Sequence, residues 1–364
     1  MEEKMTFEEL QKMLSVCIDE VIKLKQENEL LWQKNKEMEN LTEELISNQK
    51  VLIGNVSQCF ANIETNRKFC NRAIDNVRYE WQDIKPGGDD YFKINFFDFQ
   101  TTIREIVENK KSLVRFGDGE FALMAGRMRQ KFQRYDERLA ERLKEIIGVT
   151  DEGLLVAIAD NYGSLEKYTE DARQGIRNYM SKNVRAEHKK YLDVERTYHN
   201  AYITRPYAMF DDNYTEAPKI RFEHLKRIWN MRRVIFIEGT LTRLGVGNDL
   251  FDNAADIRRI EAPATSSFDR YADILQAAIR HADEDVLFLV ALGPTAEPLV
   301  YDLYLAGYQA VDIGHVDLEY EWYLNASGGR SEVKTKYNNE WSGGDCVEDI
   351  DDEEYWSQII ETIY

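Results

Sequence analysis

Short apolar runs that alternate with amphipathic stretches constrain the fold of this chain more than any other feature. The runs are four to seven residues long and lie at Leu113–Phe116, Leu154–Ile158, Val234–Ile237, Val286–Leu292 and Ala310–Ile313. Two further four-residue segments, Ala201–Thr204 and Ile257–Ile260, predict additional strands. Stretches between them, such as Asp136–Ile147 and Tyr271–Ala282, carry apolar residues on one helical face. This alternation predicts an α/β fold with a largely parallel sheet.

The first 82 residues have a different pattern, a heptad repeat with no proline and the single glycine Gly54. One seam position carries mostly leucine, at Leu10, Leu24, Leu31, Leu45 and Leu52. A sustained seven-residue period predicts a long α-helical coiled coil, roughly 110 Å at 1.5 Å per residue. Asn28 and Asn35 in the other seam favour a parallel, in-register homo-oligomer. The alternative is a bend near Gly54 and an antiparallel hairpin.

A turn-forming stretch at residues 85–90, KPGGDD, separates this arm from the rest of the chain. We therefore predict a coiled-coil arm at 1–85, an α/β domain at 86–345, and an acidic C-terminal cap or tail at 346–364.

Composition restricts the partners and the location that we expect. The net charge is −19 and no lysine- or arginine-rich block is present, which argues against a nucleic acid or an anionic membrane surface as the main partner. No apolar run reaches the ~18 residues of a transmembrane segment, and no leader-type segment opens the sequence. The four cysteines form no metal-binding spacing, so we expect a reduced, cytoplasmic protein.

Two acidic residues follow the first apolar run, in the sequence Gly117-Asp118-Gly119-Glu120. In an extended chain these two side chains point the same way, and they repel each other unless a cation, an arginine or a proton lies between them. A divalent cation with oxygen ligands, Mg²⁺ or Mn²⁺, satisfies both and would also hold substrate phosphates. The alternative is a structural turn in which one acid caps the following helix.

Polar clusters follow three other strands, at Glu238–Asp249, Gly293–Ala296 and Gly314–Trp322. The first is a glycine- and hydroxyl-rich loop with Arg243, expected to lead into a helix, and it is either a phosphate cradle or a tight structural turn. It matches neither the Walker A nor the GxGxxG pattern. Because ligands bind beyond the carboxyl ends of parallel strands, the clusters together predict a binding site there.

Four motifs taken together resemble one family. They are 115–121 (RFGDGEF), 245–251 (GVGNDLF), 292–296 (LGPTA) and 312–322 (DIGHVDLEYEW), and in this order they resemble the GT-D type glycosyltransferases, a bacterial family first described as a domain of unknown function. The likeness covers about residues 92–342. It implies a Rossmann-like domain and a metal-dependent hexosyltransferase. Such an enzyme would use a nucleotide-sugar donor, typically UDP-glucose or UDP-galactose, to extend a glycan on a surface protein or polysaccharide.

The resemblance implies that the DxE motif of the family corresponds to Asp118 and Glu120, as ligands of Mn²⁺ or Mg²⁺. Donor contacts are predicted for Arg115, Gly117, Arg243, Gly245, Gly247, Asn248, Asp249, Gly293, Thr295, His315 and Glu319. If the transfer inverts the anomeric carbon, a general base is needed, and Glu321 or Asp317 is the candidate. An extended 315–322 segment would put His315 and these acids on one side, with Tyr320 and Trp322 in the core.

Two other functions fit the same residues. A metal-dependent phosphohydrolase of a nucleotide or phosphosugar would use the same carboxylates with water as the acceptor. A non-catalytic scaffold would bind the nucleotide sugar without turning it over. Only the transferase needs a glycan or glycoprotein acceptor, so product analysis separates the first two.

Overall fold

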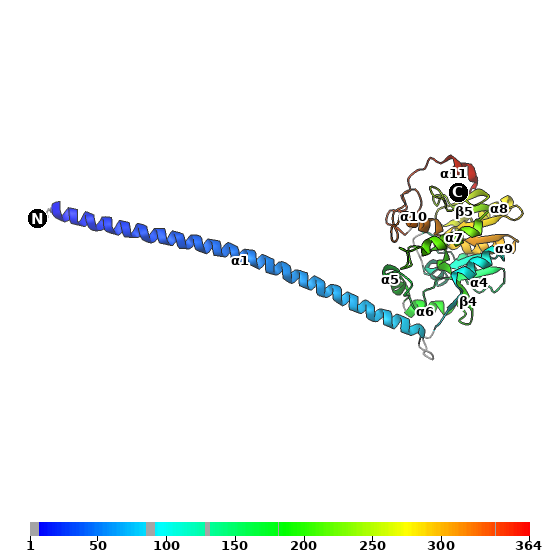
Figure 1. Ribbon diagram of the computed structural model, residues 1–364, viewed down its shortest axis with the longest axis horizontal. Coiled ribbons are helices and arrows are strands. Elements are labelled where there is room, and N and C mark those ends of the chain that lie inside the picture. Colours follow the sequence, from blue (N-terminus) through cyan, green and yellow to red (C-terminus); the bar gives the residue numbers. More distant parts are fainter. Residues whose placement is uncertain (1–6, 85–91, 128–131, 181, 339) are drawn as a thin grey trace. The chain divides into compact units, whose positions relative to one another are not determined.

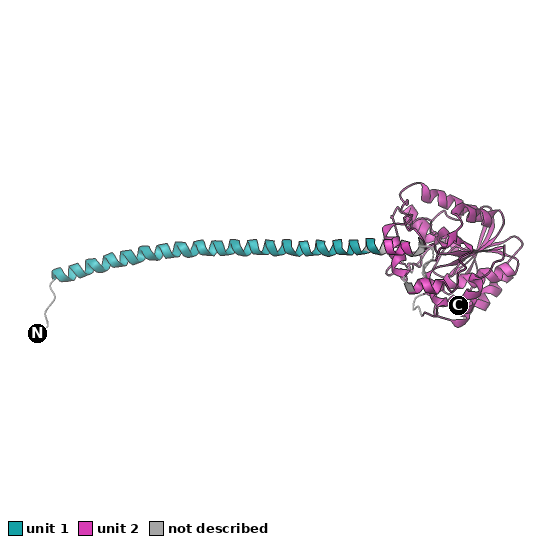
Figure 2. Ribbon diagram, turned by 90° about the horizontal axis from the view of Figure 1, so that it is seen from below, with its two compact units in different colours: residues 1–74 teal, residues 75–364 magenta. Residues whose placement is uncertain are grey.

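The computed structural model describes residues 7–84, 92–127, 132–180, 182–338 and 340–364. The chain divides into two compact units, residues 1–74 and residues 75–364 (Figure 2). The predicted break at residues 85–90 lies outside the described residues, and the three-part division remains a prediction.

The arm is one continuous helix, α1, from Phe7 to Ile84, and it runs through Gly54 without a break (Figure 1). The chain by itself therefore does not adopt the hairpin. The seam leucines are exposed, for example Leu24 at 60% and Leu45 at 67%. Among the described helices, none has the length and apolar character needed to cross a bilayer.

The second unit is built on one sheet of nine strands, and every pairing between neighbours is parallel. The order is β1-β4-β3-β2-β8-β7-β5-β6-β9. The strands are β1 (Asn95–Phe96), β2 (Ser112–Phe116), β3 (Leu154–Ile158), β4 (Thr197–Asn200), β5 (Arg233–Gly239), β6 (Asp256–Ala262), β7 (Leu287–Ala291), β8 (Gln309–Asp312) and β9 (Ile359–Thr362). This confirms the predicted α/β, largely parallel, Rossmann-like fold with a long N-terminal helix.

Helices cover both faces of the sheet. The helices of this unit are α2 (Phe99–Val107), α3 (Asp118–Met124), α4 (Glu137–Ile147), α5 (Glu170–Tyr179), α6 (Lys182–His188), α7 (Ala217–Trp229), α8 (Tyr271–His281), α9 (Ala296–Leu305), α10 (Val316–Leu324) and α11 (Glu353–Gln358), with 3₁₀ turns η1 (Ala201–Thr204), η2 (Ser267–Arg270) and η3 (Gly293–Thr295). One core joins the sheet to α4, α8 and α9, and the other joins it to α2, α7 and α10. Side chains alternate between them, because successive residues of a strand face opposite sides: Phe288 and Val290 pack in the first core, Leu287 and Leu289 in the second.

The chain order reverses at the centre of the sheet, between β2 and β8. Strands β3, β4 and β1 lie on one side of β2, and β8, β7, β5, β6 and β9 lie on the other. Such a switch point opens a crevice beyond the carboxyl ends of the two central strands, where open α/β sheets bind ligands.

Four local predictions are corrected. Residues 201–204 form η1 instead of a strand, because the Asn200 side chain accepts from the Tyr202 N–H at 2.9 Å and ends β4 there. Turns, not a helix, follow Asp249. The 315–322 segment is helical, as α10, instead of extended. The acidic C-terminal segment, expected to finish as a helix, continues past α11 into β9, which pairs with β6 at the sheet edge.

Candidate functional site

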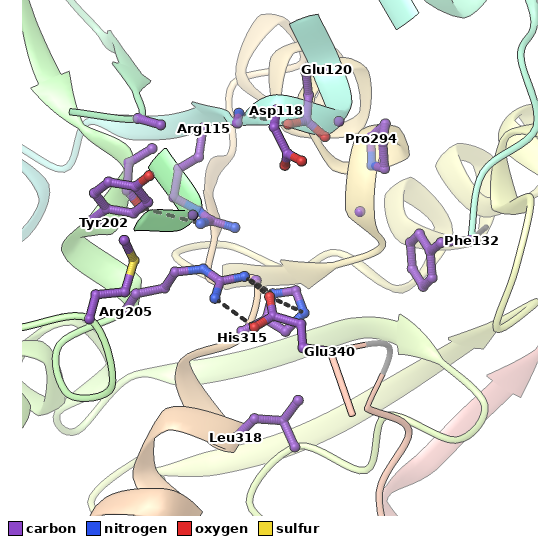
Figure 3. Close-up of a pocket in the computed structure, with 18 of the residues that line it drawn as sticks. Arg115, Asp118, Glu120, Phe132, Tyr202, Arg205, Pro294, His315, Leu318 and Glu340 are labelled. Carbon is purple, nitrogen blue, oxygen red and sulfur yellow. Dashed lines mark hydrogen bonds and ion pairs between the residues drawn. The ribbon is translucent and has the colours of Figure 1, made fainter. Parts of the chain in front are cut away.

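A cavity of about 820 Å³ lies at the carboxyl ends of the central strands. Its walls come from the segments that follow β2, β7 and β8, from the α5 face and from η1. Figure 3 shows Asp118 on one wall, with Arg205, His315 and Glu340 across the open space from it. The cavity therefore occupies the position that the switch point predicts.

Arg115 and Asp312 join β2 to β8 at the floor of this cavity. The Arg115 guanidinium donates from Nε to the Asp312 carbonyl at 3.0 Å and from Nη2 to Asp312 Oδ1 at 2.8 Å. Burial raises the pKa of Asp312, although Arg115 opposes the shift. Gly314 has φ +43°, and a Cβ there would overlap the Arg115 guanidinium. The predicted site residue Arg115 thus lines the cavity. Its guanidinium occupies space that is open because residue 314 is a glycine with a positive φ.

The two predicted metal ligands, Asp118 and Glu120, lie in the first turn of α3, not in an extended segment. The Gly117 N–H donates to Glu120 Oε2 at 2.7 Å, so Glu120 caps the helix. Burial, with the Asp118 charge adding to it, raises the pKa of Glu120 to about 7. Asp118 points into the cavity (Figure 3). The sequence left open whether these acids cap a helix or face a ligand. In the structure Glu120 caps the helix and Asp118 faces the cavity.

Carboxyl groups outnumber cationic groups on the described lining. Three arginines, Arg115, Arg205 and Arg330, face seven acidic residues: Asp118, Glu120, Asp171, Glu297, Asp312, Asp317 and Glu340. Burial, followed by the charges of Glu120 and Asp312, raises the pKa of Glu297 well above its usual range. Glu297 Oε2 is buried without a hydrogen-bond partner among the described residues. A raised pKa favours the neutral form of Glu297, so a bound cation would act on the remaining carboxylates of the lining.

The donor set fits a cation that takes part of its coordination from a substrate. In the described part of the chain no three His, Cys, Asp or Glu side chains are grouped as a complete metal site. Mg²⁺ is commonly held by one or two carboxylates together with substrate phosphates. Asp118 and Glu120 both border the cavity, and the cap bond engages only Oε2 of Glu120, so the two acids match that pattern and do not match a structural site with four protein ligands.

An ion-pair cluster that the sequence did not reveal forms the opposite wall. Arg205 donates to both Glu340 carboxylate oxygens and, at 3.3 Å, contacts His315 Nδ1. Arg330 Nε lies 2.7 Å from Glu340 Oε2. Burial alone would raise the pKa of Glu340, but Arg205, His315 and Arg330 together hold it well below its usual range. The only sequence signal for Arg205 was its position after a predicted strand.

The two predicted catalytic acids are engaged elsewhere. Lys336 Nζ lies 2.7 Å from Asp317 Oδ2 and 2.8 Å from Glu321 Oε1. The Asn248 amide donates to both acids at 2.9 and 2.7 Å, and the Gly245 N–H donates to Asp317 at 3.0 Å. Asp317 borders the cavity at 1% exposure, whereas Glu321 is not on its lining. Because Lys336, Asn248 and the Gly245 N–H all contact these two acids, the geometry favours a role in fixing the 242–249 loop.

The other predicted donor-binding residues divide into two groups. Gly117, Gly293 and His315 lie on the cavity wall. The rest are not on the lining: Arg243, Gly245, Gly247, Asn248, Asp249, Thr295 and Glu319.

The structure gives three of these residues partners within the protein. The Arg243 guanidinium is buried and donates to the carbonyls of residues 335 and 348, which turns it away from the cavity. Asp249 pairs with Lys226 at 2.9 Å. Buried Glu319 accepts from the N–H groups of residues 207 and 208, and burial raises its pKa to about 7.

The cavity has two chemically different ends. Over the β5 and β7 half, the Phe132 and Tyr337 rings lie 5.9 Å apart beside Gly293, where a Cβ would overlap the Phe132 ring. Over the β3 half, the lining is α5 and Tyr202. Figure 3 shows Phe132 and Tyr202 on opposite sides of Asp118. The 292–296 motif indicated Gly293 at the first end, but no motif included Phe132, Tyr337 or the residues of the second end.

Comparison with protein families gives one match that covers most of the second unit. The family model described as "Glycosyltransferase GT-D fold" matches residues 113–341. This range contains the central strands and every residue of the Arg205–Glu340 cluster.

Two curated relatives from streptococci are similar in sequence. "Probable glycosyl transferase Gly" of Streptococcus gordonii is 36% identical over 274 residues, 74% of this chain and 39% of the relative. "Glycosyltransferase GlyD" of Streptococcus pneumoniae serotype 4 is 37% identical over 263 residues, 72% of this chain and 32% of the relative. The chain therefore spans about a third to two fifths of the length of these relatives.

Solved structures with the same fold are also similar. One, described as a highly conserved domain of unknown function 1792 with a distinct glycosyltransferase fold, has a TM-score of 0.70 and 35% identity, covering 74% of this chain and 96% of that one. Another, described as a new glycosyltransferase from Streptococcus sanguinis, has a TM-score of 0.70 and 35% identity, covering 75% of this chain and all of that one.

Proposed function

Because this chain belongs to the GT-D glycosyltransferase family, we propose that it transfers a hexose from a nucleoside diphosphate sugar to a saccharide acceptor. The anomeric carbon loses its bond to the diphosphate oxygen and gains one to an acceptor oxygen, while the acceptor hydroxyl releases its proton. The observation that carries this proposal is the switch-point cavity, where Asp118 and Glu120 face an arginine- and histidine-containing wall.

In this proposal Asp118 and Glu120 hold Mg²⁺ or Mn²⁺. When bound, the cation would neutralise charge that develops on the leaving diphosphate. Arg115 keeps the β2 and β8 segments in register through Asp312. Arg205, Arg330 and His315 place positive charge and N–H donors opposite the carboxylates, where the diphosphate would lie between the two walls.

A uridine nucleotide is the proposed donor, with glucose or galactose as the sugar. A planar base fits the end of the cavity lined by Phe132 and Tyr337, because aromatic rings bind flat π systems well. The curated relatives are called glycosyltransferases, and the proposal extends that activity to this shorter chain.

We also propose that α1 pairs with α1 of a second copy of this chain. The helix is 78 residues long and its seam leucines are more than half exposed. Burying two such seams in parallel register would cover apolar surface that the single chain leaves in water. Cys17, Cys59 and Cys70 also occupy seam positions of the heptad repeat. Their thiols would then meet their counterparts, so mild oxidation should yield a covalent dimer. A monomeric mass in sedimentation equilibrium at micromolar concentration would contradict this pairing.

Calorimetric titration tests the donor proposal. UDP and UDP-glucose should bind in the presence of Mn²⁺ and lose at least tenfold in affinity when the metal is removed. Asp118→Asn should have the same effect, whereas Asp351→Asn, at an exposed tail position, should not. Product analysis with a saccharide acceptor then separates transfer from hydrolysis. Absence of nucleotide binding with metal present would refute the proposal.

A further inference from the structure

One face of α5 lines the cavity on the side of Asp118 away from Phe132. Asp171, Gln174, Gly175 and Asn178 are spaced i, i+3, i+4 and i+7, so they share one helical face, and all four border the cavity. Asp171 and Asn178 are exposed on this wall, so a carboxylate and an amide present hydrogen-bonding groups to the cavity, with the half-buried Gln174 between them.

Two features of this face lack a structural explanation. Gln174 Nε2 donates to Asn178 Oδ1 at 2.6 Å, but Gln174 Oε1 is buried without a hydrogen-bond partner among the described residues. Gly175 lies inside a helix, where glycine costs about 1 kcal/mol relative to alanine. A Cβ at Gly175 would meet nothing within 4 Å. Neither packing nor backbone conformation requires glycine there, and the absent side chain leaves open space on the wall, called the recess below.

An aromatic ring completes this end of the cavity. Tyr202 is half-buried, and its hydroxyl donates to Asn161 Oδ1 at 2.6 Å, so the ring is held in one orientation. Asn161 also borders the cavity. Amides and a carboxylate beside a fixed aromatic ring suit a polyhydroxylated ring, which needs many hydrogen bonds and one apolar face.

We propose that the α5 face, with Tyr202, is the acceptor-saccharide subsite. The proposal rests on the transferase function above and assigns its second substrate to a place. A transferase must hold donor and acceptor on opposite sides of the group in transfer. With the nucleoside at the Phe132 end and the diphosphate at Asp118, the acceptor hydroxyl would enter from the α5 end.

Gly175→Leu tests this subsite by filling the recess. The leucine side chain would enter open space, and the helix would gain propensity, so the fold is expected to persist. Gly54→Leu is the matched control, because Gly54 is also a helical glycine where an added Cβ would meet nothing within 4 Å, and it lies in α1. The double variant Gln174→Ala with Asn178→Ala removes the hydrogen-bonding groups instead of blocking the space.

Two readouts, made on each variant of the whole chain, decide between the outcomes. UDP affinity with Mn²⁺, measured by calorimetry, should stay within twofold of wild type. Saturation-transfer NMR with methyl glycosides of glucose, galactose and their N-acetylated amino sugars, with and without UDP, should show a signal on wild type and on Gly54→Leu. That signal should fall at least fivefold on Gly175→Leu and on the double variant.

The outcomes distinguish the two proposals. Equal glycoside signals on wild type and Gly175→Leu, or none on wild type at millimolar glycoside, would overturn the subsite while UDP binding persists. Loss of UDP affinity in Gly175→Leu would show that the recess belongs to the donor site, and this would also overturn the acceptor-subsite proposal. If wild type binds no UDP, the transferase function fails, and the glycoside comparison without UDP still decides whether α5 binds a saccharide.

Discussion

Removal of the Lys336 charge should destabilise the second unit strongly. Its side chain is 1% exposed, and its ammonium bridges Asp317 at 2.7 Å and Glu321 at 2.8 Å. The Lys336→Met substitution keeps a long apolar side chain of similar size, but it removes the cation that Asp317 and Glu321 share. Breaking a buried ion pair by removing one partner costs about 3–5 kcal/mol. The remaining bonds from Asn248 and Gly245 stabilise the acids in part, so we expect about 3 kcal/mol.

Urea unfolding followed by near-UV circular dichroism measures this loss, because the rings buried against the sheet dominate that signal. Asp317→Asn should cost less than Lys336→Met, since Lys336 keeps Glu321. The double variant should be more stable than the sum of the two losses predicts, by about 1–3 kcal/mol. A loss below about 1 kcal/mol for Lys336→Met, or additive losses, would refute the structural role inferred for these acids.

Three further predictions concern other parts of the chain. Gly314→Ala should displace Arg115 and cost at least about 1 kcal/mol, seen as a lower unfolding midpoint together with weaker UDP binding. Burial, with the charges of Arg127 and Arg185, lowers the pKa of His188 from 6.5 to about 3. The unfolded chain therefore takes up a proton first, and the stability present above pH 6.5 should fall by about 2 kcal/mol by pH 5. Urea titrations at both pH values measure this, and His188→Gln should remove most of the difference. Leu24→Asp with Leu31→Asp should yield a monomer in sedimentation equilibrium without changing the near-UV spectrum, and a persistent dimer would contradict the proposed seam.

Much of the site could be predicted from sequence because parallel strands end at a common edge. Gly117, Asp118, Glu120, Gly293 and His315 each follow a buried strand, and the cavity contains all of them. Strand position alone was enough to gather these residues, since the carboxyl ends of neighbouring parallel strands are held about 5 Å apart.

Side-chain direction could not be predicted in the same way. The 315–322 segment is apolar at nearly every second position and also fits a helix, so its period did not distinguish the two structures. Once it folds as α10, Asp317 and Glu321 lie on one face, four residues apart, and both meet Lys336. Arg243 turned away from the cavity for a related reason: carbonyls 92 and 105 residues further along the chain accept its hydrogen bonds.

The sequence by itself determined the α/β class, the long helix and the edge of the sheet where the site lies, because periodicity and strand ends are local properties. Only the tertiary structure decided which charges face the cavity. Arg205 meets Glu340 across 135 residues, and Arg115 meets Asp312 across 197. Such long-range ion pairs depend on the order of the strands in the sheet. They also depend on which buried carboxylates lack another partner. No short stretch of residues encodes either property.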